Sequence, residues 1–479
     1  MSNGDPYQDT QETIGADQRL AFTRVSAQDP FYISEKHSQF VPKEPTNIRN
    51  YFLTHRDVMP VGSTDGRVPF GSLVQFKFGN EGLPNLYALE LQVEMPIVWT
   101  LTATSHLGGT GPTGLAATFL DWCPYVGEKL ISKNGEPARI MYGTETLRSF
   151  TSTGLHVKRV LCYDSEANTK LAAYNNSVGA VQDSTAAIRY FRLPIPMPQG
   201  TDDVNFHQML PVQAFGQEFV LKFQLASMLE LVVTDGTPAN LQAQGTGSAA
   251  CPKLFLRCHY HVPEKAERCL HANTLSSPKG LTFQTMHIAR ETQVTAISSS
   301  AQTVKTSIRN STNPCVFLVA GLRWTDDVAT TGAASTYADT NSPARSINSI
   351  ICNPQWTNWL RWDAVTVTDG GNRILPKRGF DDWQNSVCNG ISCYFPCQIT
   401  TNLCVVPFSA FPRIENAGLG HISLTSLNQP QLWLDIPTTA STSSFENASM
   451  TRVLDILYFE RNMVHMKDAN IIRWFAVQD

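Results

Sequence analysis

The sequence of 479 residues is poor in charged side chains and contains no long apolar run. Only 16% of the residues are charged, and the formal net charge is −4. A chain with this balance has no general affinity for nucleic acid, because phosphates bind to basic surfaces. No apolar run reaches the roughly 18 residues that a membrane-spanning helix needs, so no such helix is expected.

The N-terminus lacks the features of a secretory signal, since no basic region with an apolar core follows Met1. We expect residues 1–50 to be an N-terminal arm and lead-in, because they are polar and poor in strand patterns. Within the first twenty residues a single Arg19 is opposed by four acidic side chains, Asp5, Asp9, Glu12 and Asp17. An arm of this charge is not expected to neutralise a genome.

Cysteine is present in an odd number, eleven, and the residues are scattered. Without an export signal, the expected state is reduced thiols in the cytosol. Two clusters contain metal-ligating residue types: Cys251, Cys258, His259, His261, Cys269 and His271 form one, and Cys388, Cys393, Cys397 and Cys404 form the other. Neither repeats the paired spacing of a common zinc module. We therefore favour ordinary strand residues and small buried hydrophobes, and predict no metal site and no cofactor.

Catalytic motifs are absent as well. The sequence contains neither G-x-S-x-G nor H-E-x-x-H. The carboxylate pairs Asp326–Asp327 and Asp381–Asp382 lie in polar segments, and sequence alone cannot place them at the separation that glycoside hydrolysis needs. We predict no catalytic residue and no enzyme activity.

Two further patterns have a simple interpretation. An N-x-[ST] triplet begins at each of Asn175, Asn310 and Asn447. Glycosylation by the host is not expected without an export signal, and the triplets alone do not decide whether these asparagines are modified. Trp356, Trp359 and Trp362 are spaced by three. A packed loop or a contact between subunits is favoured over an aromatic surface that stacks on sugars or bases.

What the sequence does contain is alternation of apolar and polar residues, most clearly in residues 218–227. Phe219, Leu221, Phe223 and Leu225 share one side, and Lys222 and Gln224 share the other. A period of two predicts a β-strand with one buried face. Residues 74–78 and 87–95 alternate in the same way, while residues 315–322 are apolar on both sides and predict a fully buried strand.

Turn signals and length divide the chain. Asn134-Gly135 predicts a hairpin between 128–132 and 138–142. A chain of 479 residues exceeds one ordinary domain, so two cores are expected. The strand at 254–262 closes the first half, and Pro263 is well placed to begin a short helix. We predict an arm at 1–50, a first β-sandwich at 51–263, a linker with a short helix at 264–280 and a second sandwich at 281–479. Residues 144–190 and 325–355 are expected to be long polar loops.

Several stretches resemble a known family. A proline-bounded strand at 193–198, then Phe215-Gly216-Gln217-Glu218-Phe219 running into Leu225-Ala226-Ser227, resembles the end of the first roll in the double jelly-roll major capsid proteins of nucleocytoplasmic large DNA viruses, the iridovirus and asfarvirus group. Residues 170–179 resemble a further segment of that family, with Ala173 where the family has glycine.

The second half resembles the same family more distantly. Phe408-Ser409, Gly418 and Ser423 match a family motif in register, whereas His421, Leu424 and Ser426 stand where the family has asparagine, arginine and aspartate. The strand at 451–463 matches the family's closing strand in position. The resemblance spans roughly residues 50 to 475 in the family's order, as a distant member would show.

The resemblance implies a fold and a role. The fold is all-β, with two tandem eight-stranded jelly-roll β-sandwiches, long loops and few short helices. The role is that of a structural major capsid protein, whose homotrimeric pseudo-hexagonal capsomers tile the icosahedral shell of a large double-stranded DNA virus. Its partners would be itself, neighbouring capsomers, and minor capsid or inner-membrane-associated viral proteins, without sequence-specific binding of nucleic acid. Its location would be the virion, after assembly in the host cytoplasm.

Two alternatives stay open at this point. The first is a minor or vertex capsid protein of the same lineage, although such proteins usually have a single roll. The second is a carbohydrate-binding or hydrolytic β-sandwich protein, which would normally carry a signal peptide. The sequence does not tell the host, the triangulation of the shell or the loops that face outward.

Overall fold

The structure is a computed structural model, and it describes a defined part of the chain. The described residues are 51–79, 82–100, 106–107, 120–122, 126–132, 136–162, 190–198, 210–212, 215, 217–234, 241–243, 247–263, 281–294, 302–308, 313–324, 362–383, 403–409, 421–437, 452–467 and 470–473. Within the described ranges, residues 54–260 and 281–473 belong to one compact unit, and residues 51–53 and 261–263 are assigned to another.

The first sandwich consists of two four-stranded sheets. One has the order β1-β13-β3-β9 and the other the order β2-β10-β7-β8. The strands are β1 (Tyr51–Val58), β2 (Leu73–Phe78), β3 (Asn85–Glu94), β7 (Ala138–Tyr142), β8 (Glu145–Phe150), β9 (Tyr190–Ile195), β10 (Phe219–Gln224) and β13 (Lys253–Pro263).

The second sandwich is built from the strands that follow. One sheet has the main order β14-β22-β16-β19, and the other has the order β15-β21-β17-β18. The strands are β14 (Leu281–Val294), β15 (Gln302–Ser307), β16 (Pro314–Trp324), β17 (Ala364–Asp369), β18 (Asn372–Gly379), β19 (Cys404–Pro407), β21 (Pro430–Ile436) and β22 (Arg452–Lys467). Two short strands extend the first of these sheets: β20 (Ile422–Ser423) pairs with β16, and β23 (Asn470–Arg473) pairs with β22.

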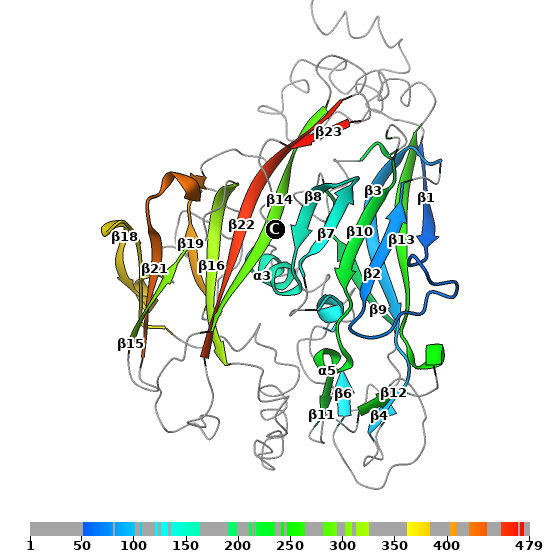
Figure 1. The fold of residues 1–479 in the computed structure, drawn as a ribbon, viewed down its shortest axis with the longest axis horizontal. Coiled ribbons are helices and arrows are strands. Elements are labelled where there is room, and N and C mark those ends of the chain that lie inside the picture. Colours follow the sequence, from blue (N-terminus) through cyan, green and yellow to red (C-terminus); the bar gives the residue numbers. More distant parts are fainter. Residues whose placement is uncertain are drawn as a thin grey trace, which may run out of the picture. The chain divides into compact units, whose positions relative to one another are not determined.

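The two sandwiches share one connectivity. When the eight main strands of each are numbered in chain order, the sheets read 1-8-3-6 and 2-7-4-5 in both halves. All the pairings are antiparallel where their register is given, as between β14 and β22. Eight antiparallel strands in two sheets with crossing connections form a jelly roll. The chain therefore has the predicted double jelly-roll fold, and Figure 1 shows the two sets of strands.

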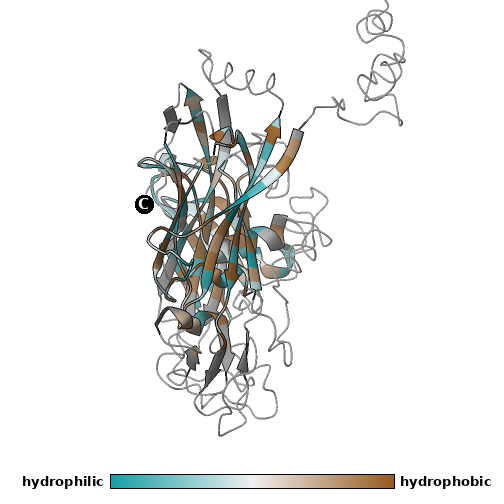
Figure 2. Ribbon diagram, turned by 90° about the vertical axis from the view of Figure 1, so that its right-hand side faces the viewer, coloured by the Kyte–Doolittle hydropathy of each residue, from teal (hydrophilic) through white to brown (hydrophobic). Residues whose placement is uncertain are grey.

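The strand β10 illustrates how the sequence builds this core. Phe219, Leu221 and Phe223 are at most 1% exposed, while the residues between them are half-buried. In register, Phe219 lies opposite Phe78 and Phe223 opposite Val74. The rings of Phe78 and Phe219 stack at 5.8 Å between centroids. Figure 2 shows the same alternation of hydrophilic and hydrophobic residues along the strands.

The strand β16 is buried on both faces, as its uniformly apolar sequence predicts. Cys315 to Leu322 are all buried. β16 lies between β22 and β19 in its sheet, so neither edge is open. The rings of Phe317 and Phe459 stack at 4.1 Å between centroids, joining β16 to β22.

The prediction of a hairpin between residues 128–132 and 138–142 is wrong. Residues Glu128–Leu130 form a 3-10 helix, η2, and Ile131 makes an isolated bridge with Leu225. β7 instead pairs with β8, and the turn between them contains Gly143 at φ +59°. The prediction failed because it relied on the local turn signal of Asn134-Gly135 alone. The side chains of η2 are buried against other elements of the fold, and this tertiary packing cannot be inferred from a turn signal.

The expected loop at 144–190 begins as core. It opens with β8 and continues as helix α3 (Ser152–Cys162), in which Val157 and Leu161 are fully buried. β8 is buried at five consecutive positions, 146 to 150, so it shows no alternation that a sequence pattern could reveal. The rest of that segment, like the predicted helix at 264–268 and the loop at 325–355, lies outside the described residues.

Short elements fill the connections of the first sandwich. They are β4 (Val98–Thr100), β5 (His106–Leu107), β6 (Leu120–Trp122), α5 (Met228–Leu231), β11 (Val232–Thr234), β12 (Leu241–Ala243) and η5 (Gly247–Ala250). The second sandwich adds α8 (Phe380–Trp383) and η9 (Leu424–Ser426). Among the described helices, none has the length and apolar character to cross a bilayer.

Candidate functional site

The contact between the two sandwiches lies at β8 and β14, both within the larger compact unit. Both are edge strands of their sheets. Figure 1 shows them side by side, with α3 next to them. Because edge strands carry backbone groups without a ladder partner, something must bind those groups when the edge is buried.

Side chains of β14 bind the backbone of β8. The Thr285 hydroxyl donates to the carbonyl oxygen of Leu147 at 3.1 Å. The backbone N–H of Ser149 donates to Nδ1 of His287 at 3.2 Å, and the Ser149 hydroxyl lies 3.2 Å from the same nitrogen. The spacing is two residues on each strand, so successive side chains on one face of β14 reach successive outward groups of β8. Thr285 and His287 are each 1% exposed.

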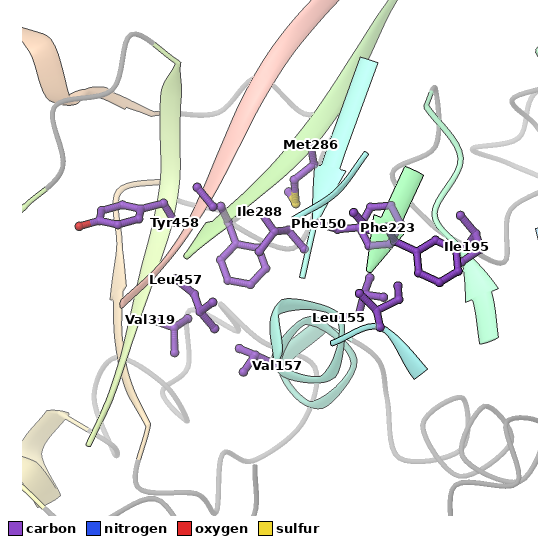
Figure 3. Packing of buried hydrophobic residues seen from close by; sticks show 14 of the residues in the cluster. Phe150, Leu155, Val157, Ile195, Phe223, Met286, Ile288, Val319, Leu457 and Tyr458 are labelled. Atoms are coloured by element: carbon purple, nitrogen blue, oxygen red, sulfur yellow. The ribbon is translucent and has the colours of Figure 1, made fainter. Parts of the chain in front are cut away.

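Apolar packing closes the junction beside these bonds. Figure 3 shows Met286 and Ile288 of β14 in one cluster with Phe150 and with Leu155 of α3. Gly154 in α3 lies so close to β14 that an added Cβ would be 2.4 Å from Cγ2 of Ile288. No real Cβ is found at that distance, so glycine is required here by space and not by backbone conformation.

The helix α3 is fixed to η2 by a buried polar contact. Nδ1 of His156 lies 2.6 Å from Oε2 of Glu128, and both side chains are at most 3% exposed. The Thr151 hydroxyl accepts from the N–H of Gly154 at 3.0 Å, as an N-terminal cap does. These bonds hold the face of α3 that meets β14.

A polar cluster covers the outer face of the sheet that contains β3 and β13. Its ring contacts are His259 with Tyr87 at 5.8 Å and with His55 at 6.2 Å between centroids. Nε2 of His259 is 3.7 Å from a carboxylate oxygen of Glu90. Arg257 donates two hydrogen bonds to Asp57, at 2.8 and 2.9 Å. Such a surface offers charge, rings and hydrogen bonds to a partner.

The carboxylates of this cluster are held ionised. The hydrogen bond from Arg257 lowers the pKa of Asp57 below its usual value. Burial alone would raise the pKa of Glu90, but His259, Gln92 and Arg192 together lower it. Burial raises the pKa of the Tyr87 hydroxyl. The two acids therefore stay charged and matched with the two arginines at neutral pH.

Of the first cysteine and histidine cluster, the structure describes Cys251, Cys258, His259 and the buried His261, and no three of these four are arranged to hold a metal. Cys258 is fully buried in β13, its neighbour His259 faces the polar cluster, and Cys251 is half-buried. Cys269 and His271 lie outside the described residues. Within the described part of the chain, no group of three or more His, Cys, Asp or Glu side chains is arranged to hold a metal.

Other predicted candidates are only partly visible. Cys404 is buried in β19, and Cys388, Cys393 and Cys397 lie outside the described residues. Trp362 is fully buried and packs edge-on against Phe380 at 5.0 Å, which agrees with the packing interpretation. Asp381 and Asp382 are exposed on α8, where Asp382 pairs with Arg378 at 3.2 Å. Asp326, Asp327, Trp356, Trp359, Asn175, Asn310 and Asn447 also lie outside the described residues.

Sequence reasoning missed the junction residues. Ser149, Thr285 and His287 belong to no motif, and each is a small or polar residue inside a strand. The only sequence signal at this place is the insertion of polar residues into otherwise apolar strands, which by itself does not identify a partner. A buried polar residue has meaning only when its hydrogen-bond partner is known.

The chain is similar to several solved structures, although it matches no protein family or curated protein by sequence. PBCV-1 VP54, whose crystal structure was fitted into a cryo-EM reconstruction of the virophage Sputnik, matches with a TM-score of 0.62 and 15% identity, over 92% of this chain and all of that one. The Faustovirus major capsid protein matches with a TM-score of 0.56 and 12% identity, over 97% of this chain and 98% of that one.

A third match supports the same fold. A chain of the Sputnik virophage cryo-EM structure gives a TM-score of 0.52 and 9% identity, over 93% of both chains. Coverage of this extent includes both sandwiches together and not a single roll. At these identities the similarity is one of fold, and it agrees with the repeated strand order.

Proposed function

We propose that this chain, with the double jelly-roll fold of those capsid proteins, is a structural major capsid protein. It would form homotrimeric pseudo-hexagonal capsomers that tile the icosahedral shell of a large double-stranded DNA virus. The observation that carries the proposal is the same eight-strand order occurring twice in one chain. Its support is the match to PBCV-1 VP54 over 92% of this chain and all of that one.

The duplication has a geometric consequence. Three copies of a chain with two similar rolls present six similar rolls around one axis. Such a trimer fills a hexagonal position in a lattice without six identical subunits. A closed homotrimer is also an ordinary symmetric assembly. A minor or vertex capsid protein with one roll would not have this property, so the duplication favours the major protein.

Two exposed surfaces are candidates for contacts between copies. The connection from β1 to β2 presents Met59 at 44% and Val61 at 53% exposure, and Leu73 at the start of β2 is 52% exposed. The backbone N–H of Val61 donates to the carbonyl oxygen of Gln75 at 2.8 Å, which fixes this connection beside β2. Exposed apolar groups gathered in this way suit association. The polar cluster on β3 and β13 is the second candidate.

The long polar loops predicted at 144–190 and 325–355 are candidates for contacts between the subunits of such a trimer, but the first of them is shorter than predicted. Residues 145–162 are core elements and do not supply an interdigitating loop. We still expect an obligate interface on the order of thousands of Å² per chain. Its other contributors would lie among residues beyond the described ranges, including the loop predicted at 325–355.

The decisive experiment is the mass of the purified chain in solution, followed by electron microscopy of the particle. The expected result in mass photometry at low concentration is a species of three chain masses. Microscopy should show pseudo-hexagonal particles of that species. A purely monomeric chain at micromolar concentration contradicts the proposal. A monomer that hydrolyses or binds glycans would favour the carbohydrate-active alternative instead.

We further propose where the protein acts and what it meets. It would reside in the virion shell after assembly in the host cytoplasm, without enzymatic activity and without cofactor or metal. Its partners would be neighbouring capsomers and minor capsid or inner-membrane-associated viral proteins. With a net charge of −4, no specific contact with the genome is proposed.

A further inference from the structure

His287 joins the two sandwiches through a bond that fixes its protonation state. A backbone amide can only donate, and the N–H of Ser149 points at Nδ1 of His287 at 3.2 Å. Nδ1 must therefore accept, and the proton of the neutral ring must be on Nε2. The assignment follows from a donor whose direction the backbone sets, and not from a choice between similar atoms.

We propose that His287 makes the junction between the two jelly rolls acid-sensitive, because the imidazolium cannot accept the hydrogen bond from the backbone N–H of Ser149, and the contact of β8 with β14 is weakened. In the charged ring both nitrogens are donors. The amide of Ser149 and the protonated Nδ1 would then face each other as two donors. The Ser149 hydroxyl, 3.2 Å from Nδ1, can accept from the charged ring, but the backbone N–H of Ser149 loses its acceptor. The ring is 1% exposed, so water cannot readily take the place of that acceptor. The inference concerns the chain itself and goes beyond the proposed capsid role.

The ionisable groups on the packed elements act in different directions. Among the described side chains they are Asp455, Glu460, Arg461, His465 and Lys467 on β22, Glu145 and Arg148 on β8, His156 and Lys158 on α3, Glu128 and Lys129 on η2, and Arg290 and Glu291 on β14 itself. Glu460 is directly opposite His287 in the β14–β22 register, and its charge favours the imidazolium. However, the amide of Asn313 already donates to this carboxylate at 3.0 Å.

Three of these groups, Arg148, His156 and Arg290, are bound to other partners. Nη1 of the buried Arg148 donates to the carbonyl oxygen of Met197 at 2.6 Å. His156 is bound to Glu128. Arg290 binds Asp455 at 3.0 Å. Glu460 therefore moderates the penalty on protonating His287 without restoring the bond from Ser149.

The linkage has a definite sign. The folded state binds the neutral ring, whereas the unfolded state protonates an exposed histidine below about pH 6.5. The unfolded state thus binds more protons on acidification, and stability falls as the pH is lowered. One such group reduces the folded-to-unfolded ratio by at most about tenfold for each pH unit below that value. We expect a reduction of at least about threefold between pH 7.5 and 5.5 that is due to His287.

The test compares three full-length proteins at pH 7.5 and 5.5 by urea unfolding. In His287→Asn, Oδ1 occupies the place of Nδ1 and accepts from Ser149 without titrating. His421→Asn is the matched control, because His421 lies in the same half of the chain and is exposed. The expected result is a fall in stability on acidification that is clearly smaller in His287→Asn than in the wild type and the control. An equal fall in all three overturns the proposal.

A second measurement needs no variant, in case His287→Asn does not fold. Hydrogen exchange of the wild-type peptide spanning 145–150, corrected for intrinsic rates, reports a small set of amides that includes that of Ser149. We expect its protection to decrease at pH 5.5 relative to a peptide from β16, which lies in the interior of its sheet. Equal retention of protection in both peptides overturns the proposal.

Discussion

Replacing Phe223 by alanine should destabilise the first sandwich by about 3–5 kcal/mol. The side chain is 1% exposed on β10, opposite Val74 of β2. Its ring stacks with that of Phe76 at 6.2 Å between centroids. Figure 3 shows it in the same cluster as Ile195 of β9, which belongs to the other sheet of the sandwich. Its removal therefore opens a cavity between the two sheets.

The magnitude follows from the area lost. A buried phenylalanine removes on the order of 150–250 Å² from water. At about 25 cal/mol per Å² this burial contributes about 4–6 kcal/mol. Alanine keeps the Cβ, and neighbours collapse only in part, so a net loss of about 3–5 kcal/mol is expected.

The assay is urea unfolding followed by circular dichroism, read from the transition of the first sandwich. A chain with two cores need not unfold in one step, so each transition is fitted separately. Lys222→Ala is the matched control one residue away on the opposite face of the same strand. Its 3.9 Å pair with the exposed Glu136 is worth less than about 1 kcal/mol. If Phe223→Ala cost no more than Lys222→Ala, the register of β10 would be wrong, since a slip of one residue exchanges the two faces.

Three further outcomes are expected. Gly154→Ala should cost about 1–3 kcal/mol by overpacking in thermal unfolding, and the loss should be smaller in an Ile288→Ala background, which lacks the Cγ2 atom that the new Cβ would meet; no loss would mean that α3 does not contact β14 as described. Asp57→Asn should cost at most about 1 kcal/mol at pH 7, because the pair with Arg257 is partly exposed. Arg257 lowers the pKa of Asp57 in the folded chain, so the pair stabilises the fold at a pH above the ordinary pKa of an aspartate. This stabilisation is lost as the pH falls through the lowered pKa, and thermal unfolding of both proteins at pH 7 and pH 3 would show the loss. Deleting residues 2–30 should leave trimers equally heat-stable but impair their assembly into a lattice, since this polar arm builds no core; failure to trimerise would make the arm part of the fold.

The sequence by itself determined the strands whose burial alternates or is uniform. Phe219, Leu221 and Phe223 are buried on one face of β10 as predicted, and β16 is buried on both faces. These features are local, because the period of side chains along a strand reflects which face meets the core. The order of several degenerate motifs then indicated two jelly rolls, which the strand order in both halves confirms. The domain boundaries at 263 and 281 stay a prediction, although no described sheet mixes strands from the two sides.

Only the tertiary structure decided the elements where burial comes from a distant part of the chain. β8 is buried at five consecutive positions and shows no period, and η2 replaces a predicted strand because Glu128 binds His156 in α3. Glycine at 154 reflects the approach of Ile288, which lies far away in the sequence. The polar side chains of Thr285 and His287 have their partners on β8, in the other sandwich. A hydrogen bond between residues 138 positions apart leaves no local pattern, because the sequence records the donor and the acceptor but not their distance.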